Sequence, residues 1–129
     1  MRYVVNQKRP TNLNLATIRF PVPAISSILH RITGVILFFA VPILLWMLQK
    51  SLTPAGFSEL QSMFGESFLW QFILWAITTA VAYHVIAGVR HLLMDMGIGE
   101  SLEGGRRGAW LVIILSAIAA VALGVWVWA

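Results

Sequence analysis

Residues 68–89 read FLWQFILWAITTAVAYHVIAGV, a continuous run without Asp, Glu, Lys or Arg. A helix rises about 1.5 Å per residue, so a run of this length can cross the roughly 30 Å hydrocarbon core of a bilayer. Two further apolar runs, about 24–48 and about 109–128, are also long enough to cross it. The sequence therefore predicts an all-α membrane protein with three transmembrane helices.

The composition of the whole chain agrees with this prediction. Of the 129 residues, 59% are hydrophobic and 11% are charged, and the mean hydropathy is +0.82. These values are too apolar for a soluble globular domain. We expect a single membrane-anchor domain over residues 1–129, with a polar N-terminal arm at 1–20. The absence of cysteine excludes disulfides, iron–sulfur ligation and thioether-linked haem in this chain.

The two segments between the expected spans carry different signals. In residues 49–67, Thr53 followed by Pro54 suits a helix N-terminus, and three apolar side chains share one face behind it. A short helix at the membrane surface is predicted there. In residues 90–108, the pair Gly104–Gly105 indicates a turn.

The basic residues predict the orientation in the membrane. Eight of the nine Lys and Arg lie in the arm, at the start of the first span or in the loop before the third, and only Lys50 lies on the other side. The positive-inside rule then places the N-terminus in the cytoplasm and the C-terminus outside it. Because the net charge of +4 is divided among the ends of apolar runs, no nucleic-acid partner is expected.

One stripe of the second span combines ionisable side chains with a glycine. At about 100° per residue, His84, Gly88, His91 and Asp95 share a narrow face. An ionisable group inside a membrane helix is a functional-site hypothesis, and Gly88 leaves room for a flat group such as haem. Axial ligation by His84 and simple helix packing both stay open. His91 lies about 10 Å further on, so a second ligand to the same iron would come from His30 or another chain.

A second polar set opens the first span. Ser27, His30 and Arg31 are spaced i, i+3 and i+4. Arg31 suits a side chain that reaches the headgroups, but with Ser27 it could also donate hydrogen bonds to a quinone carbonyl and stabilise its charge on reduction. His30 and Arg31 could equally pair with haem propionates. His91 is a surface histidine or a propionate contact, and Asp95 is a solvated carboxylate or part of a proton path.

Four motifs considered together resemble one protein family. They are Arg9-Pro10-x-Asn12-Leu13, Thr17-Ile18-Arg19-Phe20-Pro21, Ser27-Ile28-Leu29-His30-Arg31-x-x-Gly34 and His84-x-x-x-Gly88-x-Arg90-His91-x-x-x-Asp95. Their order and spacing are similar to those of the cytochrome b large membrane-anchor subunit of bacterial succinate dehydrogenase. The similarity covers almost the whole chain.

The resemblance implies half of a heterodimeric, haem-binding helical anchor in the bacterial inner membrane, with a periplasmic C-terminus. The expected partners are a second small anchor subunit, an iron–sulfur subunit, a flavoprotein subunit and membrane lipid. Electrons from succinate would pass through the iron–sulfur subunit to ubiquinone, with no succinate chemistry in this chain. A fumarate reductase anchor is the nearest alternative, and a non-catalytic scaffold or small transporter subunit is the more distant one.

The resemblance also implies roles for individual residues. His84 would be one axial ligand of haem b, and the partner anchor subunit would supply the other. Ser27 and Arg31 would belong to the ubiquinone site, with His30 and Arg31 near the haem propionates. Gly88 and His91 would complete the haem pocket, and Asp95 is a possible proton path.

Overall fold

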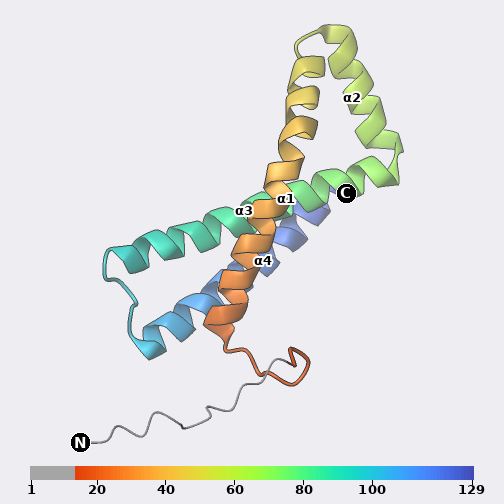
Figure 1. Ribbon diagram of the computed structural model, residues 1–129. Coiled ribbons are helices and arrows are strands. Elements are labelled where there is room, and N and C mark those ends of the chain that lie inside the picture. Colours follow the sequence, from red (N-terminus) through yellow and green to blue (C-terminus); the bar gives the residue numbers. More distant parts are fainter. Residues whose placement is uncertain (1–13) are drawn as a thin grey trace, which may run out of the picture.

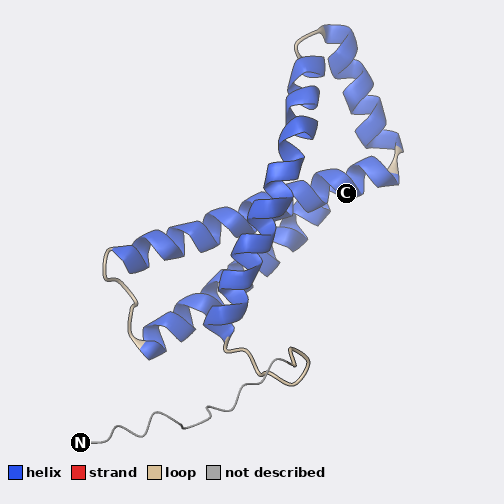
Figure 2. Cartoon of the chain, in the orientation of Figure 1, coloured by secondary structure: helices blue, strands red, loops and turns tan. Residues whose placement is uncertain are grey.

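The computed structural model describes residues 14–129, which form four helices (Figure 1). They are α1 (Val22–Ser51), α2 (Pro54–Glu66), α3 (Phe68–Asp95) and α4 (Leu102–Trp128), and this part of the chain contains no strand (Figure 2). By length and hydropathy, α1, α3 and α4 can each cross a membrane. The predicted all-α, three-span fold is therefore confirmed, and the chain is a multi-pass membrane protein.

The predicted N-terminal arm is only partly described. Residues 1–13, which include the motif Arg9-Pro10-x-Asn12-Leu13, lie outside the described range. Residues 14–20 form a turn and a non-helical segment before α1. The position of the predicted polar arm at the membrane or on a partner stays a prediction.

The helix starts follow from local chemistry. Pro23 lies in the first turn of α1, where a backbone N–H would have no partner within the helix, so its absence in proline costs nothing. The Thr53 hydroxyl accepts a hydrogen bond from the Gly56 N–H at 3.1 Å at the start of α2. The Ser101 hydroxyl accepts one from the Gly104 N–H at 3.0 Å at the start of α4. Such caps satisfy amides that have no partner within the helix, and the predicted helix after Thr53 is confirmed.

The turn between α3 and α4 differs from the prediction. Gly104 and Gly105 lie inside the first turns of α4, so the turn predicted at this pair is wrong. Ser101 caps the helix ahead of them, and the Gly105 N–H donates to the Ser101 carbonyl at 2.7 Å. The chain instead reverses at Gly97 and Gly99, which have φ values of +81° and +74°, a region that glycine occupies without steric cost. Consequently α3 and α4 both extend beyond the predicted spans.

The helices α3 and α4 pack antiparallel and contact each other at two separate levels. Near one end, the Trp75 indole N–H donates to the Ala120 carbonyl at 2.9 Å. Near the other end, the Arg90 guanidinium donates to the Gly105 carbonyl at 3.1 Å. Tyr83 lies in the buried cluster between these two contacts. The three contacts fix the register of one helix against the other.

Helix α1 packs across both α3 and α4 (Figure 1). At this crossing Ser26 is buried, and the Tyr83 hydroxyl donates to the Ser26 carbonyl at 2.9 Å. Many large apolar side chains elsewhere point away from the bundle, including Phe38, Phe39 and Trp126, which are 73%, 70% and 68% exposed. Exposed apolar surface of this extent suits contact with lipid or with another membrane subunit.

Candidate functional site

The three histidines of the chain meet where α1 crosses α3. The ring centroids of His30 and His84 lie 4.2 Å apart with the ring planes at 25°. Those of His30 and His91 lie 4.9 Å apart at 37°. His84 and His91 therefore share a face of α3, as the helical spacing predicts, and that face is directed at α1. We call these three residues the histidine cluster.

The hydrogen bonds of His84 determine which ring nitrogen is protonated. Its Nδ1 lies 3.2 Å from the His30 carbonyl oxygen and 3.2 Å from the Thr33 hydroxyl oxygen. A carbonyl can only accept, so Nδ1 carries the hydrogen and donates it. Nε2 of the neutral ring then carries the free lone pair, and it has no hydrogen-bond partner among residues 14–129. This arrangement leaves His84 able to coordinate a metal through Nε2.

Two glycines lie against the histidine cluster. A Cβ atom added at Gly34 would lie 3.2 Å from Cε1 of His84, which is tighter than ordinary contact. A Cβ atom at Gly88 would lie 3.7 Å from Nε2 of His30, an ordinary contact distance. The imidazole of His30 therefore lies beside Gly88, the position where the sequence predicted room for a flat group. Gly34 therefore leaves less room for an added side-chain atom than Gly88 does.

Ser27 and Arg31 lie on the opening turns of α1, on either side of His30 in the sequence. Ser27 is half-buried and Arg31 is exposed, and the side chain of neither one hydrogen-bonds to another residue of the described range. Their donors are therefore available to a ligand at this end of the helix. Asp95, the last residue of α3, is likewise exposed and forms no ion pair within residues 14–129.

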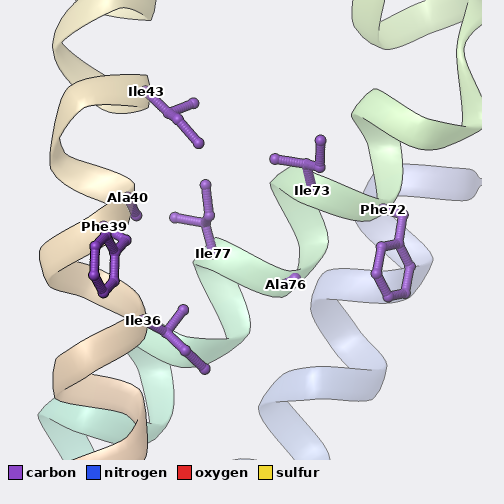
Figure 3. Close-up of a pocket in the computed structure, with 8 residues that line it drawn as sticks. All are labelled: Ile36, Phe39, Ala40, Ile43, Phe72, Ile73, Ala76 and Ile77. Carbon is purple, nitrogen blue, oxygen red and sulfur yellow. The ribbon is translucent and has the colours of Figure 1, made fainter.

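An apolar recess lies further along the same two helices (Figure 3). It has a volume of about 200 Å³ and is lined by Ile36, Phe39, Ala40 and Ile43 from α1 and by Phe72, Ile73, Ala76 and Ile77 from α3. Ile77 precedes His84 by seven residues, or about 10 Å along the helix. All the lining side chains are hydrocarbon, so the recess suits an apolar group and has no side-chain donor for a polar one.

The structure adds residues that the sequence did not single out. Thr33 contacts the predicted ligand His84 directly, and Tyr83 joins α3 to the turn that carries Ser27. Gly34 was visible only as part of a motif. The rings of the histidine cluster stack on one another, and within residues 14–129 neither they nor any other three His, Cys, Asp or Glu side chains are arranged so that they could hold one metal ion together. The described part of the chain therefore offers individual histidine ligands and no complete metal cage.

Comparison with known proteins places the chain in a family. Residues 5–123 match the succinate dehydrogenase/fumarate reductase transmembrane subunit family. The chain belongs to this family. It is 39% identical to the succinate dehydrogenase cytochrome b556 subunit of Coxiella burnetii, over 96% of this chain and all of the relative. It is 35% identical to the subunit of that name from Rickettsia felis, covering 94% of each protein.

A third relative and the motifs agree with this assignment. The succinate dehydrogenase cytochrome b556 subunit of Paracoccus denitrificans is 34% identical over 88% of this chain and 87% of its own length. The resemblance noted from four motifs is thus confirmed over nearly the full length. Membership makes the chain a succinate dehydrogenase cytochrome b membrane subunit and part of an enzyme complex.

Proposed function

We propose that this chain is the haem b- and ubiquinone-binding anchor of a succinate dehydrogenase and that His84 is an axial haem ligand. The observation that carries the proposal is the state of His84. Its Nδ1–H donates to two oxygen atoms of α1, which leaves the Nε2 lone pair for iron. The names of the relatives favour this function over a fumarate reductase anchor.

The residues around His84 fit a haem. Gly34 leaves just enough space for the edge of the His84 ring, so the ring is supported from α1 on the side of Nδ1. His30 and Arg31 are cation-capable donors for the propionates, and Gly88 and His91 complete the pocket. When bound, haem b supplies a one-electron carrier. The other ligand would come from a second anchor subunit, as the family resemblance implies, and His30, whose ring stacks on that of His84, would stay on the propionate side.

Ser27 and Arg31 bind and orient the ubiquinone head. The Ser27 hydroxyl and the Arg31 guanidinium donate hydrogen bonds to one carbonyl oxygen of the quinone. As that oxygen gains negative charge on reduction, the fixed positive charge of Arg31 stabilises it. Asp95 lies at the same end of the bundle and is exposed to solvent, which supports its proposed role in a proton path toward this oxygen. The electrons come from the iron–sulfur subunit, which takes them from the flavoprotein subunit that oxidises succinate.

The charge distribution supports the proposed orientation. The arginines of the described range lie at the end that carries the histidine cluster: Arg19, Arg31, Arg90, Arg106 and Arg107. Lys50 lies at the opposite end and is paired with Glu59 at 2.5 Å. The positive-inside rule then places the histidine cluster and the N-terminus at the cytoplasmic side of the inner membrane. The iron–sulfur and flavoprotein subunits dock on that side, and the C-terminus is periplasmic.

The haem assignment is tested by His84→Leu in the purified complex. We expect the reduced haem b absorbance to be lost or strongly altered relative to the flavin content. Val85→Leu is a matched control, because Val85 is the next residue and is 57% exposed. A variant complex that retains all subunits and an unchanged haem spectrum would falsify the ligand assignment.

The quinone assignment is tested by Arg31→Leu. We expect succinate-to-ubiquinone electron transfer to fall while the reduction of a soluble dye by succinate continues, because the dye takes electrons upstream of the anchor. Arg106→Leu removes an exposed arginine from the same end of the bundle and should spare both activities. Equal loss of both activities in Arg31→Leu would contradict a specific role at the quinone.

A further inference from the structure

We propose that Thr33 is a positioning residue that accepts the Nδ1–H of His84 and so fixes the ligand ring and tunes the haem reduction potential. This inference rests on the proposed ligand role of His84. It assigns to a side chain of α1 a role that acts through His84.

The donor and acceptor roles follow from three distances. The Thr33 hydroxyl donates its one hydrogen to the His30 carbonyl at 2.9 Å. Its lone pairs remain to accept from His84 Nδ1–H at 3.2 Å. The same Nδ1 lies 3.2 Å from the His30 carbonyl. The reverse assignment would direct the lone pair of Nδ1 at that carbonyl and lose one hydrogen bond, so the Nδ1–H tautomer is favoured.

The three groups form a closed set between two helices. Thr33 and the His30 carbonyl belong to α1, whereas His84 belongs to α3. Gly34, the next residue of α1, meets Cε1 of the same ring. Thr33 is the only residue in this set whose side chain accepts from the ring. Its hydroxyl therefore distinguishes this crossing from a simple packing contact.

Another threonine, Thr78 of α3, shows the hydrogen bonding that is usual for threonine in a helix. The Thr78 hydroxyl donates to the carbonyls of Leu74 at 2.8 Å and Trp75 at 3.1 Å, both in its own helix. Bonds of this kind are common for threonine in helices and join nothing between α1 and α3. Thr78 is therefore the matched control for a change at Thr33.

Loss of the Thr33 acceptor has a predictable electronic effect. An imidazole whose N–H donates to an acceptor is a more basic metal ligand, and a more basic ligand favours the ferric over the ferrous iron. Without the hydroxyl, only the His30 carbonyl accepts from Nδ1–H. We expect ferric haem to be less favoured by about threefold to tenfold, which raises the haem midpoint potential by about 28 to 59 mV for a one-electron couple.

The experiment compares Thr33→Val, Thr33→Ala and Thr33→Ser in the purified complex, with Thr78→Val as the control. Haem content and midpoint potential are measured by optical redox titration. We expect Thr33→Ser to behave as the parent, because it keeps the hydroxyl, and both hydroxyl-free variants to shift upward together. Loss of haem from these two variants, with the other subunits retained, would also support the inference.

Other outcomes overturn the inference. If Thr33→Val matches the parent while Thr33→Ser and Thr33→Ala change alike, side-chain volume and not the hydroxyl is what matters. Unchanged potentials in all variants, or loss of the assembled complex in both hydroxyl-free variants, also reject a positioning role. Failure of the proposed function would be recognised separately, because His84→Leu would then leave the haem spectrum unchanged.

Discussion

Replacement of Gly34 by alanine tests how closely α1 supports the ring of His84. The added Cβ would lie 3.2 Å from Cε1 of His84, whereas ordinary contacts begin at 3.4 Å. Gly34, Thr33 and the His30 carbonyl all belong to α1, so relief of the contact moves the ring away from all three. We therefore expect Gly34→Ala to weaken haem binding without unfolding the helix.

The size of the effect follows from the same geometry. A displacement of about 0.2 Å lengthens both hydrogen bonds of His84 Nδ1 to about 3.4 Å, beyond the usual range for N–H···O bonds. Loss of such support to a metal ligand costs about tenfold or more in affinity. The helix itself gains up to about 1 kcal/mol, because alanine has a higher helix propensity than glycine. Haem affinity should therefore fall while helix stability rises, so the two effects of the substitution can be told apart.

The assay follows the transfer of haem from the purified complex to a haem scavenger, with flavin as the internal standard. We expect Gly34→Ala to lose haem about tenfold faster than the parent. Gly65→Ala is the control, because a Cβ atom there meets nothing within 4 Å and changes only helix propensity. Equal rates of haem loss in the parent and Gly34→Ala would refute the reasoning about ring support.

Two further predictions concern the fold around the site. Tyr83→Phe removes the hydroxyl that donates to the Ser26 carbonyl at 2.9 Å, and we expect the free energy of unfolding to fall by about 1 kcal/mol. The complex should then be inactivated at a lower temperature, and an unchanged temperature would contradict the prediction. Thr53→Ala removes the cap on the Gly56 N–H and should lower the stability of α2 by about 1 kcal/mol. We expect faster hydrogen exchange in the first turn of α2 and an unchanged haem content.

The positions of the helices could be predicted because their causes are local. Long apolar runs specify α1, α3 and α4, and the pair Thr53–Pro54 specifies the start of α2. The turn at Gly104–Gly105 was predicted wrongly because two glycines are poor helix formers when considered alone. In the structure a cap at Ser101 precedes them, and the Arg90 guanidinium of α3 donates to the Gly105 carbonyl. The second of these contacts depends on how two helices pack.

Only the α3 half of the candidate site could be predicted from the sequence. Helical periodicity places His84 and His91 on one face of α3, and the structure agrees. Which residues of α1 meet that face depends on where the two helices cross, and that is set by packing along their whole length. His30 was expected as a possible ligand or propionate contact, but its stacking on both other histidines has no signature in the sequence. The contact of Thr33 with His84 could not be predicted from the sequence for the same reason.

The crossing of α1 and α3 joins the two proposed functions of the chain. Tyr83 and His84 are consecutive residues of α3, and they hydrogen-bond to α1 at Ser26 and at Thr33 respectively. The α1 segment between these two contacts carries Ser27 and Arg31, the residues proposed to bind the quinone. A rotation of α1 against α3 would therefore displace the quinone donors and the support of the haem ligand at the same time. It follows that changes at the crossing should alter haem potential and quinone reduction together, whereas a change at Arg31 alone should affect quinone reduction more strongly.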